Sequence, residues 1–493
     1  MQEQKKIGIL GFGVVGKSAL NFLSYSYEGR DDKKSNIKIS VFDQRDLSVD
    51  EIAQINRHGG VYFQDKNNIS KFFEENDYII VSPGVDLNPF QQYSHKFIFE
   101  LDLFSSVFKN KTIAITGTLG KTTVTNMIYK IVSSFWKDES LQNYKVGLGG
   151  NIGYGMLDLA LKAGQLDLAV LELSSFQLEL NKSFAPYIAL WTNFFPNHLD
   201  RHKTLKEYFD AKWKIFANQT EEQFSLIPVW LLYSYLNLEE KLLSLKSKIY
   251  FVSARPLSED EMVKLSKLNK DVFFIENNGL FLGRFVTNEG FIRKKIADLS
   301  NLPNFSFLEN WILIMAAFYL LNHNLDFLKD SNWQSKLIEM KFNPSVDAYR
   351  LEHFAHYNDI DFYDDSKSTV TQATKAALEK LMGNNRPVIL ILGGLDKGVD
   401  RTKFFEELKL ISKNRLKAVF CLSKQDSGFL DFKKFSSLQD LIKAIAEIAQ
   451  PGDQVLFSPA GTSFDFFKNY KHRGDQFKEV VNEYIRKGEF IKT

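Results

Sequence analysis

The segment Thr112-Ile113-Ala114-Ile115-Thr116-Gly117-Thr118-Leu119-Gly120-Lys121-Thr122-Thr123 decides how the middle of this chain folds. Its apolar, β-branched first half predicts a buried strand, and its glycine-containing second half predicts a tight turn. The pattern of residues 124–135 predicts a helix after the turn. A strand, a glycine turn and a helix in this order direct backbone N–H groups and the positive end of the helix dipole at an anion. The segment therefore predicts a phosphate-binding loop.

The end of this loop carries the side chains that a nucleoside triphosphate needs. Lys121 would reach the β- and γ-phosphates, and the hydroxyl of Thr122 would ligate Mg²⁺. The strict spacing GxxxxGK[ST] is not met, because Ile115 stands where the first glycine is expected. The loop is a shorter variant, T-G-T-x-G-K-T, and we expect the chain to bind ATP.

Size and charge narrow the class of protein. A chain of 493 residues suggests about three domains of ~150 residues each, and 44% hydrophobic residues support well-buried cores. The 62 basic and 60 acidic residues leave a net charge of +2, which gives no case for binding nucleic acid or a membrane surface. A single cysteine, Cys421, excludes an internal disulfide framework and indicates a reducing compartment.

The N-terminus could be mistaken for a signal peptide, because Lys5-Lys6 precede the apolar residues 7–15. Three glycines at GxGxxG spacing and the lack of a small-residue cleavage site argue against that interpretation. No apolar run reaches the ~18 residues that a membrane span requires. We therefore expect a cytoplasmic protein that does not insert into a membrane.

The pattern of residues 1–109 predicts a domain like those that bind dinucleotides. Residues 7–10 read as a strand, 11–16 as a GxGxxG turn, 17–24 as the start of a helix, and 37–42 as a second strand that ends at Asp43. An insert over 28–36 precedes the second strand, and residues 78–81 read as a third strand.

Residues 110–346 predict a second domain around the phosphate loop. Strands are expected over 168–171 and 188–192, whereas residues 225–305 read as short strands and polar turns. Glu172 follows the first of these strands and would supply a hard oxygen ligand for Mg²⁺. The alternative is a strand-end carboxylate in solvent.

Two histidines and a lysine later in this domain are further candidate site residues. His198 and His202 stand four residues apart, which could suggest zinc, but no third soft ligand accompanies them, and a lone histidine is more often structural. A capping box at 204–207 predicts the start of a helix. Lys212 lies on the apolar stripe of this helix, which is formed by Leu205, Tyr208, Phe209, Ile215 and Phe216. A desolvated Lys212 would lose its proton more readily and could form a carbamate, while the alternative is a lysine whose ammonium extends back to water.

Residues 347–493 predict a third domain with a parallel sheet. Strands are expected over 362–363, 388–392, 418–422 and 454–457, with helices over 372–381 and 438–448 between them. Three polar turns, 364–369, 393–398 and 458–463, follow strands, where open α/β sheets place their ligands. They predict a second substrate pocket.

Taken together, these residues resemble the Mur ligase family over nearly the whole chain. The most specific stretches are the phosphate loop, Glu172-Leu173-Ser174-Ser175-Phe176-Gln177-Leu178-Glu179, 193–201, 365–369 and 458–470. The resemblance implies an α/β fold of three domains, Rossmann-like at both ends with a P-loop ATPase-type sheet between them. The run ELSSFQLE is most similar to the member that adds D-glutamate to UDP-N-acetylmuramoyl-L-alanine.

The resemblance also implies how ATP and two Mg²⁺ ions would be held. The nucleotide set would be Gly117, Thr118, Gly120, Lys121, Thr122, Thr123, Asn310, Arg350, Asp365 and Lys367. The metal ligands would be Thr122, Glu172, His198 and a carbamylated Lys212. Of all these, Lys121, His198 and Lys212 would act in catalysis.

Both substrates are implied in the same way. The UDP part of the acceptor would meet Gly13, Val14, Val15, Asp43, Gln44 and Arg45. The muramoyl-alanine part would meet Asn151, Ser174 and Gln177, and D-glutamate would meet Thr369, Lys397, Ser463 and Tyr470. The alanyl carboxylate would attack the γ-phosphate to give an acyl phosphate, which the amine of glutamate would then attack. A monomer is expected.

Some positions depart from the family's pattern, and alternatives stay open. Leu119 and Val370, like Phe307, stand where Asn is common, and Asn197 stands where Asp is frequent. The alternatives are another Mur-type or folylpolyglutamate-type ligase, an NAD-dependent oxidoreductase based on GFGVVG and Asp43, and a non-catalytic ATP-binding relative. An NAD-dependent oxidoreductase would have no use for the phosphate loop. The interval from the glycine motif to Asp43 also exceeds the ~20 residues that usually separate such a motif from its acidic residue.

Overall fold

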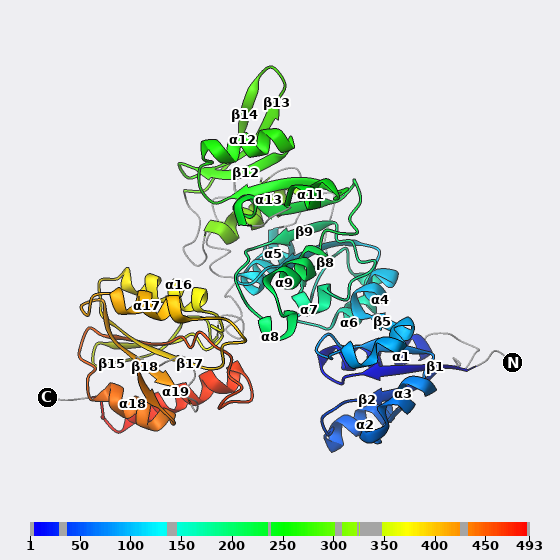
Figure 1. The fold of residues 1–493 in the computed structure, drawn as a ribbon, viewed down its shortest axis with the longest axis horizontal. Coiled ribbons are helices and arrows are strands. Elements are labelled where there is room, and N and C mark those ends of the chain that lie inside the picture. The colour runs from blue at the N-terminus through cyan, green and yellow to red at the C-terminus, as the bar shows by residue number, and fades with distance from the viewer. Residues whose placement is uncertain are drawn as a thin grey trace. The chain divides into compact units, whose positions relative to one another are not determined.

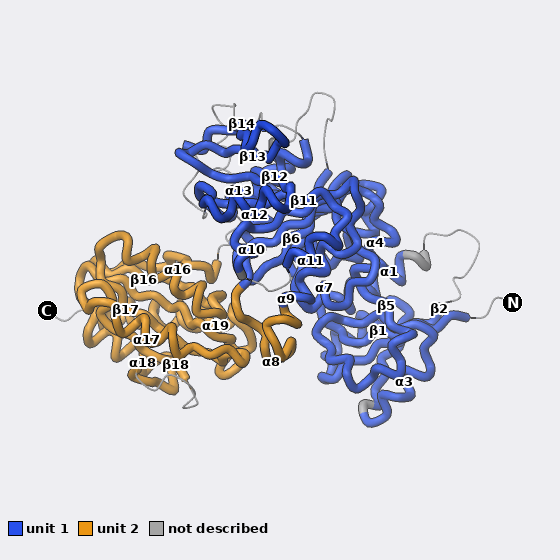
Figure 2. The backbone as a smooth tube through the Cα atoms, turned by 45° about the horizontal axis from the view of Figure 1, so that its top comes forward, with its two compact units in different colours: residues 1–194, 209–340 blue, residues 195–208, 341–493 orange. Residues whose placement is uncertain are grey.

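A computed structural model describes residues 4–28, 37–135, 145–234, 238–300, 308–322, 325, 348–423 and 432–490 (Figure 1). The expected insert over 28–36 and the departure at Phe307 lie outside these ranges, apart from residue 28. The chain groups into two compact units, one of residues 1–194 with 209–340 and one of 195–208 with 341–493 (Figure 2). The described strands form three sheets, one each within 5–99, 111–298 and 352–457. The domain limits at 109/110 and 346/347 stay predictions.

The N-terminal sheet has the order β3-β2-β1-β4-β5 among the described strands, and all of its neighbours are parallel. The strands are β1 (Lys5–Leu10), β2 (Ile37–Phe42), β3 (Gly60–Tyr62), β4 (Tyr78–Val81) and β5 (Phe97–Phe99). The helices are α1 (Val14–Glu28), α2 (Val49–Arg57), α3 (Ile69–Glu75) and α4 (Glu100–Val107), with 3₁₀ turns η1 (Lys66–Asn68) and η2 (Asn88–Lys96). The expected second strand at 37–42 and the strand at 78–81 are confirmed, but the short β3 between them was missed.

Helix α1 begins earlier than the sequence indicated. It starts at Val14 rather than at residue 17, so Gly16 belongs to the helix and not to the turn. A Cβ atom at Gly16 would collide with the carbonyl oxygen of Gly11. The third glycine of the motif therefore lets the first turn of the helix pack directly on the strand end.

The central sheet has the order β14-β13-β12-β11-β10-β9-β6-β8-β7 in the described part of the chain. Its strands are β6 (Lys111–Thr116), β7 (Val146–Gly150), β8 (Leu168–Glu172), β9 (Ile188–Trp191), β10 (Phe224–Pro228), β11 (Lys248–Ser253), β12 (Asp271–Glu276), β13 (Gly279–Val286) and β14 (Gly290–Asp298). Strands β7 to β12 pair in parallel, whereas β12, β13 and β14 form an antiparallel meander. The phosphate-loop strand β6 lies between β8 and β9, so both of its neighbours can bring residues to the loop.

The helices between residues 121 and 322 follow, of which α8 and the start of α9 belong to the second unit. They are α5 (Lys121–Phe135), α6 (Met156–Ala160), α7 (Ser175–Leu178), α8 (Leu199–His202), α9 (Leu205–Trp213), α10 (Leu231–Ser234), α11 (Leu238–Leu243), α12 (Glu259–Leu268) and α13 (Leu308–Asn322), with the 3₁₀ turn η3 (Ala163–Gln165). The expectation that 225–305 holds only strands and turns is wrong, because α10, α11 and α12 lie there. Ser258 begins α12 with a capping box to Glu261, a signal that the sequence does contain.

The C-terminal sheet has the described order β15-β16-β20-β17-β18-β19. Its strands are β15 (Glu352–Tyr357), β16 (Ile360–Asp364), β17 (Val388–Gly393), β18 (Leu416–Leu422), β19 (Lys433–Phe435) and β20 (Gln454–Phe457). The helices are α16 (Thr371–Met382), α17 (Thr402–Leu410), α18 (Leu438–Ala446) and α19 (Tyr470–Arg486). The four expected strands and both expected helices are present. The sheet is not wholly parallel, because the edge strand β15 forms an antiparallel hairpin with β16.

Apolar side chains cover these sheets on both faces, as parallel sheets require. In the C-terminal unit, alternate residues of β17 divide between two clusters: Ile389 and Ile391 join one, and Leu390 and Leu392 join the other. The buried helix α13 is apolar on nearly all sides. Among the described residues, no helix combines the length and the apolarity that crossing a lipid bilayer would demand.

Candidate active site

The phosphate loop connects the buried end of β6 to the first turn of α5. Gly117 has a φ of 141° and Gly120 a φ of 78°, in the region that L side chains rarely adopt. A Cβ atom at Gly117 would collide with the hydroxyl of Thr192, and one at Gly120 would lie 2.7 Å from Oδ1 of Asn310. Both glycines are therefore required by conformation and by space. The predicted residue Asn310, 7% exposed on α13, lies directly against the loop.

The residues after β9 anchor this loop. The side-chain oxygen of Asn193 accepts from the Leu119 N–H at 2.7 Å, and its amide donates to the Leu119 carbonyl at 3.1 Å. The Thr192 hydroxyl also donates to that carbonyl, at 2.6 Å. The sequence predicts no separate role for Asn193, although a polar residue directly after a strand of this domain is a usable signal. At position 119 these anchoring bonds involve the backbone, so the leucine side chain there does not disturb them.

Lys121 folds back over the loop. Its Nζ donates to the carbonyl oxygens of Gly117 at 3.0 Å and Thr118 at 2.9 Å. Thr122 is 5% and Thr118 7% exposed, while Thr123 is half-buried on the first turn of α5. The ammonium group and the N-terminus of α5 together make a site with positive potential for phosphate oxygens.

Glu172 lies buried at the carboxyl end of β8, only 2% exposed. The alternative of a strand-end carboxylate in solvent is therefore wrong. Its Oε1 accepts from the Asn151 amide at 2.8 Å, and its Oε2 has no hydrogen-bond partner among the described residues. A buried carboxylate oxygen without a partner is costly unless a cation satisfies it. Hard oxygens of this kind suit Mg²⁺, so the donor set fits the predicted metal.

Lys212 is 1% exposed, and its Nζ donates to the carbonyl oxygen of Gly117 at 2.8 Å. The alternative of an ammonium extended to water is therefore wrong. Burial, together with the positive charge of Lys121, lowers the pKa of Lys212 well below its usual value, against the opposing effect of Glu172. These three side chains consequently influence one another electrostatically around the first glycine of the loop.

The apolar stripe that led to Lys212 is only partly as expected. Leu205 is 39% exposed, and α9 ends at Trp213, before Ile215 and Phe216. The latter two are buried in the turn that follows the helix, so burial there does not follow one helical face. The start of the helix is as predicted, with the Thr204 hydroxyl accepting from the Glu207 N–H at 3.1 Å.

In the N-terminal sheet, Asp43 holds the glycine turn. Its Oδ2 accepts from the Phe12 N–H at 2.6 Å and its Oδ1 from the Arg45 N–H at 2.9 Å. The Arg45 guanidinium donates to both oxygens of Glu51 at 2.8 Å. Val14 is 66% exposed, Val15 half-buried and Gln44 exposed, and a Cβ at Gly13 would meet no described atom within 4 Å. The six predicted UDP residues thus lie together at the carboxyl ends of β1 and β2.

The run after β8 forms a polar network with a residue that the sequence analysis missed. Ser174 caps α7, and its N–H and hydroxyl both donate to Oε1 of Gln177 at 3.1 Å. The Gln177 amide donates to Glu100 on α4 at 3.4 Å, and Glu100 also accepts from the Met156 N–H at 3.2 Å. Burial raises the pKa of Glu100 to about 7, against the hydrogen bonds from Gln177 and Met156. Nothing in the sequence around Glu100 distinguishes it from an exposed helix residue.

In the second unit, the three predicted polar turns leave adjacent strands at one edge. Strands β16, β20 and β17 are parallel neighbours, so their carboxyl ends point the same way. The Leu395 N–H donates to the Thr462 carbonyl at 3.1 Å, and the Thr462 N–H returns a bond of 2.9 Å. Buried Arg473 donates to the carbonyls of Ser366 at 2.6 Å and Gly461 at 3.0 Å. The prediction that all three turns follow strands is confirmed, and the substrate pocket that they would form stays a prediction.

The predicted nucleotide residues of this unit lie in or beside the first turn. Asp365 is buried, and its oxygens accept from the Ser458 hydroxyl at 2.6 Å and the Leu351 N–H at 3.1 Å. Burial raises the pKa of Asp365 to about 7, against the effects of the Ser458 bond and the charge of Arg350. Lys367 lies with its Nζ 5.2 Å from the ring centre of Tyr470.

The predicted D-glutamate residues and His198 also fall in this unit. Thr369 is half-buried after β16, and Ser463 is 3% exposed after β20. Lys397 donates to the Asn197 side chain at 3.2 Å and accepts, through its carbonyl, from the Asp200 N–H at 3.2 Å. His198 precedes α8 with a left-handed φ of 57°, and its ring centre lies 6.1 Å from that of Tyr208.

Comparison with known proteins supports the same class. The model of the Mur ligase middle domain matches residues 115–273, and that of the Mur ligase glutamate ligase domain matches residues 349–461. The UDP-N-acetylmuramoylalanine--D-glutamate ligase of Aquifex aeolicus (strain VF5) is 32% identical over 421 residues, which cover 83% of this chain and 88% of that protein. The enzyme of that name from Caldicellulosiruptor saccharolyticus is 31% identical, over 97% of this chain and 99% of that protein.

Two solved structures share the fold at 15% identity. The MurF ligase of Thermotoga maritima in complex with ADP has a TM-score of 0.52 and covers 86% of this chain and 92% of its own. MurF from Acinetobacter baumannii has a TM-score of 0.55, with 96% and 93% covered. These matches confirm the expected α/β fold. The two family models and the relatives that align over most of its length show that the chain belongs to the Mur ligase family.

Proposed function

We propose that this chain is an ATP-dependent ligase that adds D-glutamate to UDP-N-acetylmuramoyl-L-alanine in the synthesis of peptidoglycan precursors. The names of the relatives that align over nearly the whole chain support the substrate pair. The observation that carries the activation step is the convergence of Lys121 and Lys212 on the carbonyl of Gly117, beside the half-satisfied carboxylate of Glu172.

ATP would bind with its phosphates on the loop. The ammonium of Lys121, which donates to loop carbonyls in this structure, would exchange those bonds for phosphate oxygens. It would then neutralise the charge that develops as the alanyl carboxylate attacks the γ-phosphate and ADP leaves. The amine of glutamate would attack the resulting acyl phosphate, forming the amide bond and releasing phosphate. Asn310 would lie on the nucleotide side, since it already contacts the loop at Gly120.

Thr122 and Glu172 would hold a Mg²⁺ ion. The ion would supply positive charge against the phosphate oxygens and orient them for in-line transfer. Glu172 is suited to this role because one of its oxygens is fixed by Asn151 while the other is buried without a partner among the described residues. Thr122, 5% exposed on the first turn of α5, would provide the second protein oxygen.

Lys212 would act as a carbamate. A neutral amine attacks CO₂, an N–C bond forms, and one proton is released to leave a carboxylate on the nitrogen. The lowered pKa of Lys212 favours the neutral amine, and the new negative charge would replace repulsion with Lys121 by attraction. The carbamate oxygens would be hard ligands for a second Mg²⁺. His198 stays a predicted ligand of that ion.

The substrate-binding assignments follow the elements that hold them. The turns after β1 and β2 would take the UDP part of the acceptor, and Asn151, Ser174 and Gln177 would take its muramoyl-alanine part. In the second unit, Lys397, Thr369, Ser463 and Tyr470 would receive D-glutamate, with Arg350, Asp365 and Lys367 on the nucleotide. Residues 1–109, 110–346 and 347–493 would correspond to the acceptor, ATP and amino-acid domains of a cytoplasmic monomer.

The test is phosphate release from ATP and Mg²⁺ in the presence of UDP-N-acetylmuramoyl-L-alanine. D-glutamate would be compared with L-glutamate, L-lysine and meso-diaminopimelate. Release that requires both the acceptor and D-glutamate supports the proposal. Release with a different amino acid would keep the ligase class and reassign the pocket of the second unit. An absence of release with all four would contradict catalysis and favour a non-catalytic ATP-binding relative.

A further inference from the structure

The hairpin of β15 and β16, at the edge of the C-terminal sheet, carries a β-bulge that changes which side chains share a face. His353 pairs with Tyr363 and His356 pairs with Asp361, but the register shifts by one residue between His353 and Ala355. In a regular strand, residues three apart point to opposite faces. The extra residue, Phe354, restores the parity and places both histidines on the face of Asp361.

The bulge also explains where Phe354 goes. Its ring packs 5.5 Å from that of Phe477 and 6.4 Å from that of Phe362, on the apolar side of the hairpin. The strand thus packs a partly buried aromatic ring against the core on one face while both histidines stay on the other. The side chains of His353 and His356 are 48% and 54% exposed, whereas that of Asp361 is 10% exposed.

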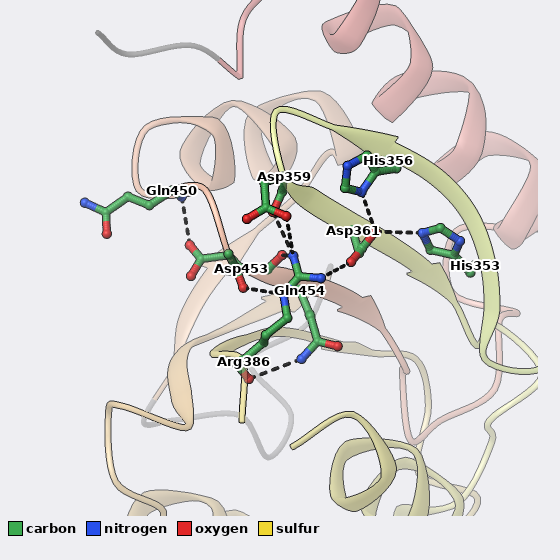
Figure 3. A network of polar contacts seen from close by, with 9 residues as sticks. His353, His356, Asp359, Asp361, Arg386, Gln450, Asp453 and Gln454 are labelled. Atoms are coloured by element: carbon green, nitrogen blue, oxygen red, sulfur yellow. Dashed lines mark hydrogen bonds and ion pairs between the residues drawn. The ribbon is translucent and has the colours of Figure 1, made fainter. Parts of the chain in front are cut away.

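Three potential ligand atoms converge on this polar face (Figure 3). Nε2 of His353 lies 2.8 Å and Nδ1 of His356 lies 2.7 Å from the same oxygen, Oδ1 of Asp361. The nitrogens and the carboxylate oxygen all lie within 4.8 Å of one another. Ligand atoms around a bound Zn²⁺ are about 3 Å apart or slightly more, given metal–ligand distances near 2 Å. Small rotations of the two exposed rings would therefore suffice to admit an ion.

The other oxygen of Asp361 is held by a fixed partner. The guanidinium of Arg386 forms an ion pair with Oδ2 and donates to the carbonyl of Asp359 at 2.7 Å (Figure 3). It also donates to the carbonyl of Gly452 at 2.8 Å. Metal-ligating carboxylates commonly have such an outer partner, which fixes the orientation of the ligating oxygen. Arg386 leaves Oδ1 directed at the two imidazoles.

We propose that His353, His356 and Asp361 form a binding site for one divalent first-row transition metal ion, with Zn²⁺ as the first candidate. Two imidazole nitrogens and one carboxylate oxygen form a donor set that suits transition metal ions better than it suits Mg²⁺. Three protein ligands leave a fourth position for water. The ion would connect the edge strand β15 to β16 and so stabilise the hairpin. This site lies outside the residues proposed for ATP, Mg²⁺ and D-glutamate, and the inference does not depend on the proposed function.

The competing explanation is a hydrogen-bonded ion-pair network that takes up no metal. It accounts for the contacts of Asp361 with Arg386 and with each histidine separately. The two explanations differ in what happens on titration with ZnCl₂, because a hydrogen-bonded network that is complete without an ion predicts no saturable Zn²⁺ binding.

The experiment is calorimetric titration of the metal-free full chain with ZnCl₂ at pH 7.5. We expect one Zn²⁺ site, which is lost in the double variant His353→Ala/His356→Ala. Each single variant should lower the Zn²⁺ affinity by more than ~10–100-fold, which is the loss expected when only a hydrogen-bond partner of a metal ligand is removed. His95→Ala, which removes an exposed imidazole elsewhere, and His198→Ala, which removes one from the proposed active site, should leave this site in place. Zn²⁺ should also raise the melting temperature of the wild type and not of the double variant.

Two results would overturn the proposal. One is Zn²⁺ binding of equal affinity and stoichiometry in the wild type and the double variant. The other is a wild type without saturable binding at micromolar protein. Both histidines are half exposed, so the variants should fold, and circular dichroism of each variant without metal checks this. His353→Gln and His356→Gln keep a hydrogen bond to Asp361, so loss of the site in them would separate metal ligation from the network.

Discussion

The Nζ of Lys212 lies 2.8 Å from the carbonyl oxygen of Gly117, although 95 residues separate them in the chain. The bond brings a buried amine with a lowered pKa to the first glycine of the phosphate loop. The loop carbonyl that receives it also accepts from Lys121.

Substitution of Lys212 by Ala should abolish phosphate release, because the amine that would form the carbamate is lost. Short carboxylic acids such as acetate or formate should restore part of the activity by supplying oxygens in the vacated space. The matched control is Lys206→Ala, which removes an exposed lysine from the same helix, α9. Full activity of Lys212→Ala without added acid would contradict a ligand role for this residue.

Substitution of Glu172 by Gln should lower phosphate release by about 100-fold or more, since a charged ligand near the developing charge is lost. The same change removes a buried negative charge with an unsatisfied oxygen, so the metal-free protein should melt no lower than the wild type. Thermal melts with and without Mg²⁺ and ATP measure both effects. Asp167→Asn, at the exposed opposite end of β8, is the control. A variant that keeps the full Mg²⁺-dependent stabilisation would argue against Glu172 as a ligand.

Substitution of Gly120 by Ala should raise the KM for ATP and destabilise the loop. The φ of 78° costs an L residue about 1–2 kcal/mol, and the added Cβ would lie 2.7 Å from the side chain of Asn310. Gly164→Ala is the matched control, because its φ is not positive and a Cβ there would meet no described atom within 4 Å. Steady-state kinetics over a range of ATP concentrations distinguishes the two variants, and equal KM values would contradict the predicted constraint.

Glu100 should make folding stability depend on pH. Burial raises the pKa of this carboxyl to about 7 from the ordinary 4.5, so the folded state binds the proton more tightly than the unfolded state. Its contribution is fully present below about pH 4.5 and is lost as the pH rises to 7, with a total of about 3 kcal/mol at 1.36 kcal/mol per pKa unit. Glu100→Gln should remove this part of the pH dependence in urea titrations between pH 5 and 8. The control Glu74→Gln, which changes an exposed glutamate of α3, should retain the pH dependence of the wild type. Equal pH profiles for Glu100→Gln and the wild type would show that Glu100 does not titrate in this range.

Much of the fold follows from local patterns. The strand, turn and helix at 111–135, and strands β2, β4 and β20, lie where the apolar runs and turn residues predict them. Most of the errors share one cause: the short β3, helices α10 and α11 and the antiparallel edge strand β15 have weaker local patterns and depend on neighbouring elements for their stability. Helix α12 is the exception, because its capping box could have been recognised in the sequence.

The sequence alone determined the chemistry that this chain carries: a phosphate loop, a buried-type strand ending in Glu172, a lysine on an apolar stripe and polar turns after strands. Those features are local, because hydrophobic periodicity, glycine conformation and capping act over a few residues. Only the tertiary structure decided which of them meet. The sheet order placed β6 between β8 and β9, so that Asn193 anchors the loop and Lys212 contacts Gly117. Likewise, a one-residue bulge in β15 brought His353 and His356 to Asp361, because the register between two paired strands is set by packing on both faces and not by either strand alone.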